Sequence, residues 1–376
     1  MFRPYDEVKN WILESGLVEK TLENQGGVHS FYDEGLKSFG FLYPEITGYF
    51  ISTLRYIHKN ENSNSHLIDL AKASSDWLIS IFENYGGIVM GIDNQKTKTS
   101  LAFSFDTAVC AKGLLDCYSL TNEKKYFEYA EKFVEWIKVS IETNGTVKPY
   151  KDLEKNIFME NDDVWYKQKG CLNIKSVIPF LTLFNYNNDQ ELLKISNNIC
   201  NTFRKYQNND GSFSMHEGSS VINLHTQCYA LEGLLFSYYI TKNNDYLESC
   251  KRSIHWSIQN MKKNGSIPLW FNTKYHSNAS YPIAQLIRLM VLIDSIDHEE
   301  KYRSTVKTLT TFLSTLQAQS TNPKINGGFY EEFYKSIFGW KKRKKLNSWG
   351  SMFALQSFSL VDNYDKISFD MIEFLY

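Results

Sequence analysis

The sequence has few prolines and none of the short motifs that hold metals or nucleotides. Seven prolines occur in 376 residues, so long helices can run without interruption. HExxH, paired CxxC, a P-loop and a GxGxxG turn are all missing, which argues against zinc enzymes, P-loop NTPases and dinucleotide-binding folds. We therefore expect neither a metal site nor a cofactor.

The six cysteines are scattered without paired spacing, and most of them fall in apolar helical patterns. Buried, reduced thiols suit this distribution better than a disulfide framework. The N-terminal stretch carries charges throughout and lacks the apolar run of a signal peptide or a membrane span. We expect a cytoplasmic protein without a transmembrane segment, and a peripheral position at the inner membrane is left open.

No charge sign dominates the chain. The 41 Lys and Arg against 42 Asp and Glu give a formal net charge of −1, which argues against general nucleic-acid binding. Hydrophobic residues make up 43% of the chain and charged residues 22%, so the protein can bury a large core.

Glycine turns recur along the chain at intervals of about 60 residues. This interval is too long for a one-helix repeat and suits a helical hairpin with its connectors. Each turn follows a helix-like pattern and precedes another: Gly26-Gly27, Gly86-Gly87, Asn144-Gly145, Asp210-Gly211, Asn264-Gly265 and Gly327-Gly328.

The helices on the two sides of these turns differ in polarity. Those before the turns have one apolar stripe and one polar face, as in residues 66–85, 126–143, 191–207, 245–262 and 299–317. Those after the turns have few charges on any side, which is typical of nearly buried helices, as in residues 43–57, 105–118, 172–184, 226–239, 281–293 and 349–361.

Six alternations of this kind predict an inner ring of six helices wrapped by an outer ring of six. We therefore expect an all-α fold, an (α/α)6 toroid formed by residues 1–376 as a single domain. Minor short strands are expected near the mouth, for instance in residues 88–90 and 212–215. An open α-solenoid is the alternative, and it would present a concave face in place of a closed cup.

The connectors predict where function resides. Those that lead into an inner helix are long, as in residues 27–42, 145–170 and 327–348, whereas the return connections are short. Successive hairpins place all the long connectors at one end of the barrel, where they can build a pocket. Polar side chains in the first turns of the inner helices then point into it.

Four residues at these positions are the candidate catalytic groups. They are Glu45, which opens the first inner helix, Asp106, which opens the second, and His225 and Tyr229, which share one face of the fourth with Glu232. Carboxylates in an aromatic, poorly solvated pocket can donate protons near neutrality. Asp106 also fits a helix cap, and His225 also fits a buried, hydrogen-bonded histidine.

Further polar and aromatic residues near the mouth are candidate substrate contacts. Four tryptophans in or beside the long connectors, at positions 165, 270, 340 and 349, fit either sugar stacking or core packing. The basic run of residues 341–345 fits a solvated loop, or a grip on an anionic sugar, a phosphate or an acidic membrane surface. The predicted substrate-binding set is Tyr43, Tyr49, Asp162, Asp163, Trp165, Gln285, Arg288, Asn347 and Trp349.

Residues 43–49, 225–235, 284–288 and 347–349 resemble segments of the VpsJ-type polysaccharide-biosynthesis proteins. The resemblance spans most of the chain and implies a toroid that works in capsule or exopolysaccharide biosynthesis. It implies a carbohydrate or a lipid-linked glycan as substrate and polysaccharide-assembly proteins as possible partners. The wider toroid class includes glycoside hydrolases, sugar epimerases, polysaccharide lyases, terpenoid cyclases and prenyltransferases, and a fold alone does not choose among them.

Our leading hypothesis is an enzyme that acts on a sugar chain by acid–base chemistry and catalyses hydrolysis, epimerisation or elimination. Glu45 is its general acid or base, Asp106 the partner carboxylate, and His225 and Tyr229 the opposing proton-transfer wall. Substrate-orienting contacts come from Gln285, Asn347 and Trp349. One alternative is a non-catalytic glycan-binding or scaffold protein of an assembly complex. Another is a terpenoid or prenyl-type enzyme, for which residues 161–164 offer only a poor acidic motif.

Overall fold

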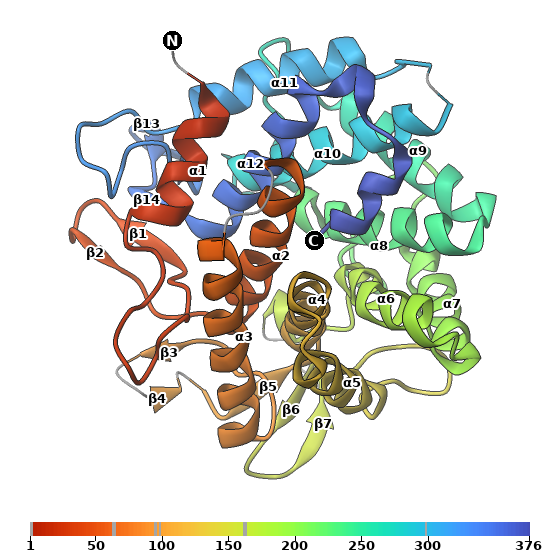
Figure 1. Cartoon of the computed structure of the whole chain (residues 1–376). Coiled ribbons are helices and arrows are strands. Elements are labelled where there is room, and N and C mark those ends of the chain that lie inside the picture. The colour runs from red at the N-terminus through yellow and green to blue at the C-terminus, as the bar shows by residue number, and fades with distance from the viewer. Residues whose placement is uncertain (1–2, 62–64, 94–95, 98, 161–163, 298) are drawn as a thin grey trace.

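The helices form two concentric rings (Figure 1). The computed structural model describes residues 3–61, 65–93, 96–97, 99–160, 164–297 and 299–376. Odd-numbered helices form the outer ring and even-numbered helices the inner ring: α1 (Pro4–Glu14), α2 (Pro44–Glu61), α3 (Ser65–Tyr85), α4 (Ser104–Thr121), α5 (Lys124–Lys138), α6 (Val177–Asn187), α7 (Gln190–Phe203), α8 (Leu224–Thr241), α9 (Asn244–Gln259), α10 (Ser280–Asp297), α11 (Arg303–Thr315) and α12 (Ser348–Asp362).

The two rings close. Each inner helix packs against the next, from α2 with α4 round to α10 with α12, and α12 packs against α2, while α1 lies on α12. The closure also includes a strand pair in which Phe31 lies opposite Asn347. An open solenoid is therefore excluded and the expected (α/α)6 toroid is confirmed.

Burial separates the two rings as the polarity of the sequence predicts. In α8 every residue from Leu224 to Ser237 is buried, whereas α11 buries only Val306, Leu309 and Leu313. Inner helices also approach closely where the sequence has glycine. A Cβ on Gly48 of α2 would lie 2.9 Å from the backbone oxygen of Val109 in α4, so a side chain at this crossing would push the two helices apart.

Each recurring glycine turn follows one outer helix along the chain and lies beside the next outer helix. Positive φ is found at the single glycine of three turns and at the first glycine of the three glycine pairs, for example +97° at Gly211. A Cβ on Gly211 would also meet the backbone oxygen of Arg252 in α9 at 2.5 Å. The positive-φ glycine packs in this way on the next outer helix in every turn except that of Gly86, which has open space around its Cβ. At the other turns only glycine combines this backbone conformation with this contact.

The third inner helix departs from the sequence-based expectation. Residues 172–184 were predicted as one continuous helix, but a 3-10 helix, η2 (Cys171–Ser176), precedes α6. Pro179 explains the break, because it lacks an N–H and is tolerated only in the first turn of an α-helix. The α-helix therefore begins at Val177, and the residues before it wind more tightly.

Short strands lie in the long connectors and form small antiparallel sheets at the mouth, as expected for minor strands. Residues 88–90 and 212–215 themselves make only isolated bridges. The strands are β1 (Phe31–Asp33), β2 (Ser38–Phe39), β3 (Ile92–Asp93), β4 (Lys96–Thr97), β5 (Leu101–Phe103), β6 (Tyr150–Asp152), β7 (Ile157–Met159), β8 (Ile222–Asn223), β9 (Trp270–Phe271), β10 (Ser277–Ala279), β11 (Phe329–Tyr330), β12 (Glu332–Ser336), β13 (Gly339–Lys342) and β14 (Lys345–Asn347).

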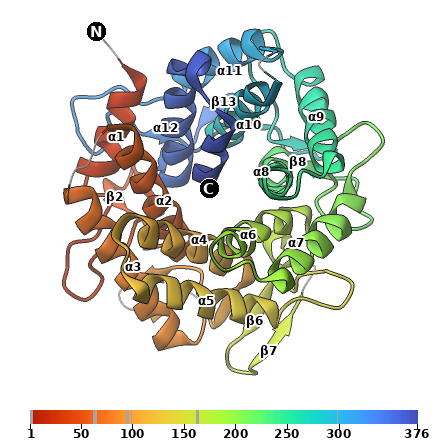
Figure 2. The same cartoon turned by 45° about the vertical axis from the view of Figure 1, so that its right-hand side comes forward.

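The opposite end of the barrel is closed by residues 364–376, which lie at the centre of the ring in both views (Figures 1 and 2). This segment includes the 3-10 helices η4 (Tyr364–Lys366) and η5 (Phe369–Phe374), and η5 packs on α2, α8 and α10. Two more 3-10 helices are η1 (Trp165–Lys167) and η3 (Arg204–Tyr206). The toroid is therefore a cup that is open at the connector end.

The six cysteines are all buried and none forms a disulfide, as the sequence predicts. In the described part of the chain, no helix combines the length and the apolar character that crossing a membrane requires.

Candidate active site

A cavity of about 540 Å³ lies at the connector end of the toroid. The first turns of α2, α4, α8, α10 and α12 form its floor and walls, and the long connectors form its rim. This size suits a small organic ligand such as one or two sugar units. The cavity holds all four predicted catalytic residues, Glu45, Asp106, His225 and Tyr229.

Glu45 and Asp106 are a coupled pair of buried carboxyl groups. Their residues are 8% and 5% exposed. Burial raises the pKa of Glu45 to about 7, and the nearby hydroxyl of Tyr43 and the positive charge of Lys175 act against this rise. Burial and the negative charge of Glu45 raise the pKa of Asp106 well above its ordinary value. Near neutral pH the carboxyl group of Glu45 is therefore partly protonated, and its charge and burial both favour the protonated form of Asp106.

Asp106 is not the cap of its helix. No side chain caps the start of α4, and Oδ2 of Asp106 is a buried atom without a hydrogen-bond partner among the described residues. A buried carboxylate oxygen left without a partner is rare in a folded protein. Its position in the cavity wall makes it available to a bound molecule.

His225 faces the cavity from the start of α8. Its ring lies between two tyrosines, with centroid distances of 4.1 Å to Tyr229 and 4.5 Å to Tyr281. Its Nδ1 lies 2.6 Å from Oε1 of Gln285. Burial, together with the positive charges of Lys175 and Arg288, lowers the pKa of His225 to about 3 against the hydrogen bond to Gln285. The imidazole is therefore neutral at pH 7.

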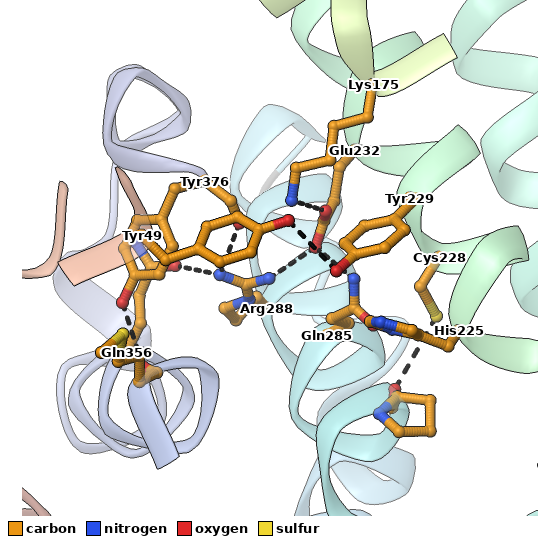
Figure 3. A network of polar contacts seen from close by, with 12 residues as sticks. Tyr49, Lys175, His225, Cys228, Tyr229, Glu232, Gln285, Arg288, Gln356 and Tyr376 are labelled. Carbon is orange, nitrogen blue, oxygen red and sulfur yellow. Dashed lines mark hydrogen bonds and ion pairs between the residues drawn. The ribbon is translucent and has the colours of Figure 1, made fainter. Parts of the chain in front are cut away.

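A buried polar network lies behind this wall (Figure 3). Glu232 accepts hydrogen bonds from Lys175 at 2.7 Å, from Arg288 at 2.5 Å and from Gln285 at 3.0 Å. Burial lowers the pKa of Lys175 to about 8, and Glu232 acts against that shift. Charges this deep in a protein are tolerated only when they are paired.

Four residues of the predicted substrate-binding set lie behind the wall in this structure, and their contact with a substrate stays a prediction. Gln285 and Arg288 are completely buried around Glu232. Tyr49 is also completely buried, and its hydroxyl donates to the Tyr229 hydroxyl at 3.1 Å. Asn347 caps α12 by accepting from the backbone N–H of Gly350 at 2.7 Å.

The other predicted contacts divide into two groups. Tyr43, Trp165 and Trp349 line the cavity. Asp162 and Asp163 lie outside the residues that the structure describes, so their prediction stays open.

The sequence analysis named the basic run 341–345 near the mouth but missed the carboxylates and the tyrosine that surround Arg343 on the rim. The Nη2 atom of Arg343 lies 3.0 Å from Oε2 of Glu332, and the hydroxyl group of Tyr275 donates a hydrogen bond to the same oxygen at 2.9 Å. Glu331 is beside them, and burial raises its pKa. All four line the cavity. Arg343 belongs to the basic run 341–345. This run is not one solvated loop, because it forms parts of two strands and the connection between them. The run was the sequence feature that pointed to this side of the rim.

Aromatic side chains cover much of the remaining wall. Trp349 lies 5.8 Å from Tyr281, centroid to centroid, and both line the cavity with Trp270. Trp340 is half exposed on β13 and is absent from the lining. Among the described residues, no group of three or more His, Cys, Asp and Glu side chains is arranged to hold a metal ion.

The fold matches that of several solved sugar enzymes. Cellobiose 2-epimerase from Bacillus thermoamylovorans B4167 superimposes with a TM-score of 0.77 at 12% identity, covering 94% of this chain and 98% of the other. A D-mannose isomerase gives 0.75 at 11% identity, covering 96% of each chain. An unsaturated glucuronyl hydrolase specific for heparin gives 0.71 at 12% identity, covering 97% of this chain and 98% of the other.

At such low identity these matches show the shared fold. No family model matches the chain, and no curated protein matches it in sequence. The resemblance to VpsJ-type proteins therefore stays a prediction.

Proposed function

We propose that this protein is an enzyme that binds a carbohydrate in the cavity and acts on it by acid–base chemistry. The observation that carries the proposal is the pair of buried carboxyl groups, Glu45 and Asp106, which line an aromatic-walled cavity and whose pKa values are both raised. A pair in this state contains both a proton donor and a proton acceptor. A scaffold that only binds a glycan has no use for such a pair.

The cavity residues have distinct parts in this chemistry. The protonated member of the Glu45–Asp106 pair donates to a sugar oxygen, while the ionised member accepts a proton or stabilises positive charge at the reacting carbon. His225 is neutral and accepts a hydrogen bond from a sugar hydroxyl on the opposite wall. Tyr229 receives the hydroxyl proton of Tyr49 in a hydrogen bond, so its own proton is available to the ligand.

The aromatic wall supports a sugar as the ligand. Sugar rings have apolar C–H faces that pack on aromatic rings, and Trp349, Trp270 and Trp165 line the cavity. The matched epimerase, isomerase and hydrolase, by their names, all act on sugars. The sequence resemblance adds a context in cytoplasmic steps of surface-polysaccharide biosynthesis, with a lipid-linked glycan as one form of the substrate.

Incubation with sugars in D₂O tests the proposal and separates the three reaction types. The panel holds neutral, amino and acidic mono- and disaccharides, read by NMR and mass spectrometry. Epimerisation places solvent deuterium on carbon, hydrolysis creates a new reducing end, and elimination creates a carbon–carbon double bond. The Glu45→Gln variant is the matched control. If the wild-type protein neither binds nor changes any sugar of the panel, the proposal fails.

A further inference from the structure

A buried chain of hydrogen bonds connects Glu232 to His225 through Gln285 (Figure 3). Nε2 of Gln285 donates to Oε1 of Glu232 at 3.0 Å, and Oε1 of Gln285 lies 2.6 Å from Nδ1 of His225. Glu232 and Gln285 are completely buried, whereas His225 is 7% exposed and lines the cavity. This chain of hydrogen bonds therefore begins in the protein core and ends at the cavity.

The donor and acceptor roles in this chain of hydrogen bonds follow from its charged end, Glu232. Glu232 is paired with two cations, Lys175 and Arg288, so its carboxylate is ionised and can only accept hydrogen bonds. The amide of Gln285 must then turn its NH₂ group to Glu232 and its oxygen to His225. An amide oxygen can only accept, so the proton of the neutral imidazole is on Nδ1.

The other ring nitrogen is left for the ligand. Nδ1 points at Gln285 behind the wall, so Nε2, on the other side of the ring, points away from Gln285. No hydrogen bond to Nε2 is present among the described residues. The rings of Tyr229 and Tyr281 flank the imidazole and hold it in this orientation.

We propose that Glu232 and Gln285 are positioning residues that hold His225 in the Nδ1–H tautomer, so that its Nε2 accepts a hydrogen bond from a hydroxyl group of the bound sugar. The choice of a hydroxylated ligand rests on the proposed function, whereas the tautomer does not. Glu232 never touches the ligand. It acts on His225 through one amide, and Lys175 and Arg288 keep it ionised.

Nitrogen-15 NMR of the imidazole groups tests the tautomer directly, because protonated and bare ring nitrogens have different chemical shifts. The chain has 8 histidines, and a His225→Gln variant identifies the His225 resonances by their disappearance. In wild-type protein without ligand we expect a protonated Nδ1 and a bare Nε2, unchanged between pH 5 and pH 8. A proton on Nε2, or a protonated imidazolium in this range, would overturn the proposal.

The variant Gln285→Met tests whether the amide is the cause. Methionine fills a similar volume without a hydrogen-bond acceptor for Nδ1, and Glu232 keeps both of its cations. We expect a mixture of the two tautomers. Gln356→Met is the matched control, because Gln356 is also buried and accepts from Arg288 at 2.7 Å but does not contact His225. The tautomer should stay as in wild type in this control.

Two outcomes of the variant series would overturn the role of the amide. One is a single Nδ1–H tautomer in folded Gln285→Met, and the other is the same mixture in both methionine variants. Should Gln285→Met fail to fold, Gln285→Asn withdraws the same amide by one methylene and is read in the same way. None of these measurements needs turnover, so the tautomer can hold even if the sugar reaction is disproved.

Turnover adds a readout if a substrate is found. Loss of the fixed tautomer should raise KM for the hydroxylated sugar at least fivefold in Gln285→Met. The corresponding deoxy sugar, which lacks the hydroxyl group that Nε2 receives, should be bound equally by the variant and by wild type. An equal loss for both sugars would contradict the hydroxyl contact but leave the tautomer in place.

Discussion

Glu45 and Asp106 lie close enough in one buried space that the negative charge of Glu45 raises the pKa of Asp106, and burial together with the charges of both carboxyl groups raises the pKa of Tyr43. The two carboxyl groups come from the first turns of α2 and α4, which are neighbours in the inner ring. This relationship depends on the close approach of the two helices at Gly48. A toroid with a wider crossing would separate the two carboxyl groups and weaken the effect of Glu45 on the pKa of Asp106.

Glu45→Gln should abolish turnover while the melting temperature stays within a few degrees of wild type. The amide keeps the size of the side chain but can neither donate a carboxyl proton nor carry negative charge. General acid–base groups contribute roughly 10²- to 10⁴-fold in rate, so we expect kcat to fall at least 100-fold. Steady-state kinetics and thermal unfolding measure the two quantities.

Glu61→Gln is the control for this substitution, because Glu61 ends the same helix at the opposite end of the barrel. Its carboxylate accepts from Tyr5 and Lys9 on α1 and has no part in the cavity. Turnover should be unchanged in this variant. If Glu45→Gln unfolds the protein and activity merely follows the folded fraction, Glu45 is structural.

The raised pKa of Glu45 also predicts how stability depends on pH. The pKa rises from 4.5 in the unfolded chain to about 7 in the folded protein, so between these values the folded state binds more protons. The contribution of this group to stability is complete below pH 4.5 and is lost as the pH rises through 7. Relative to Glu45→Gln, wild type should lose up to about 3 kcal/mol over this range.

Urea unfolding of both proteins at several pH values measures this difference. Subtracting the variant removes the opposite effect of His225, whose lowered pKa costs stability as the pH falls from 6.5 towards 3. A constant difference between the two proteins from pH 4.5 to pH 7 would show that Glu45 has an ordinary pKa.

The ring could be predicted from the sequence because its cause is local and repeated. Each glycine turn, amphipathic helix and buried helix is visible within one stretch of the chain, and the six repeats add up to a closed double ring. The break before Val177 was missed because one proline was outweighed by an apolar pattern. The strands around residues 341–347 were missed because a basic run gives no alternation of apolar and polar residues.

The site could be predicted only in part, for a geometric reason. The first turns of inner helices lie at the mouth, which placed Glu45, Asp106 and His225 in one cavity. Sequence spacing does not say how deep a residue lies, so Gln285 and Arg288 were expected on the wall although they lie behind it. Residues of the long connectors, such as Glu332, have no helical phase from which their direction could be inferred.

Trp349→Ala should weaken substrate binding more than it slows the reaction. Trp349 lines the cavity beside Tyr281, and losing an aromatic surface of this kind removes about 1–2 kcal/mol of apolar contact. We expect KM to rise roughly 5- to 30-fold with kcat changed less than threefold. Trp340→Ala is the control, because Trp340 is half exposed outside the cavity. Equal effects of the two substitutions would remove Trp349 from the substrate contacts.

Gly327→Ala should open the ring at its closing contact. Gly327 has a φ of +88°, and a Cβ there would overlap the backbone carbonyl of Glu7 in α1, so the last turn could no longer pack on the first helix. Gly86→Ala is the control, because Gly86 has a φ of +73° but open space around its Cβ. The control should lose about 1 kcal/mol of unfolding free energy from the backbone alone, and Gly327→Ala about 3 kcal/mol or more. Urea unfolding at one pH measures both. Similar losses in the two variants would mean that α1 moves aside freely and that its contact with the last turn does not hold the ring closed.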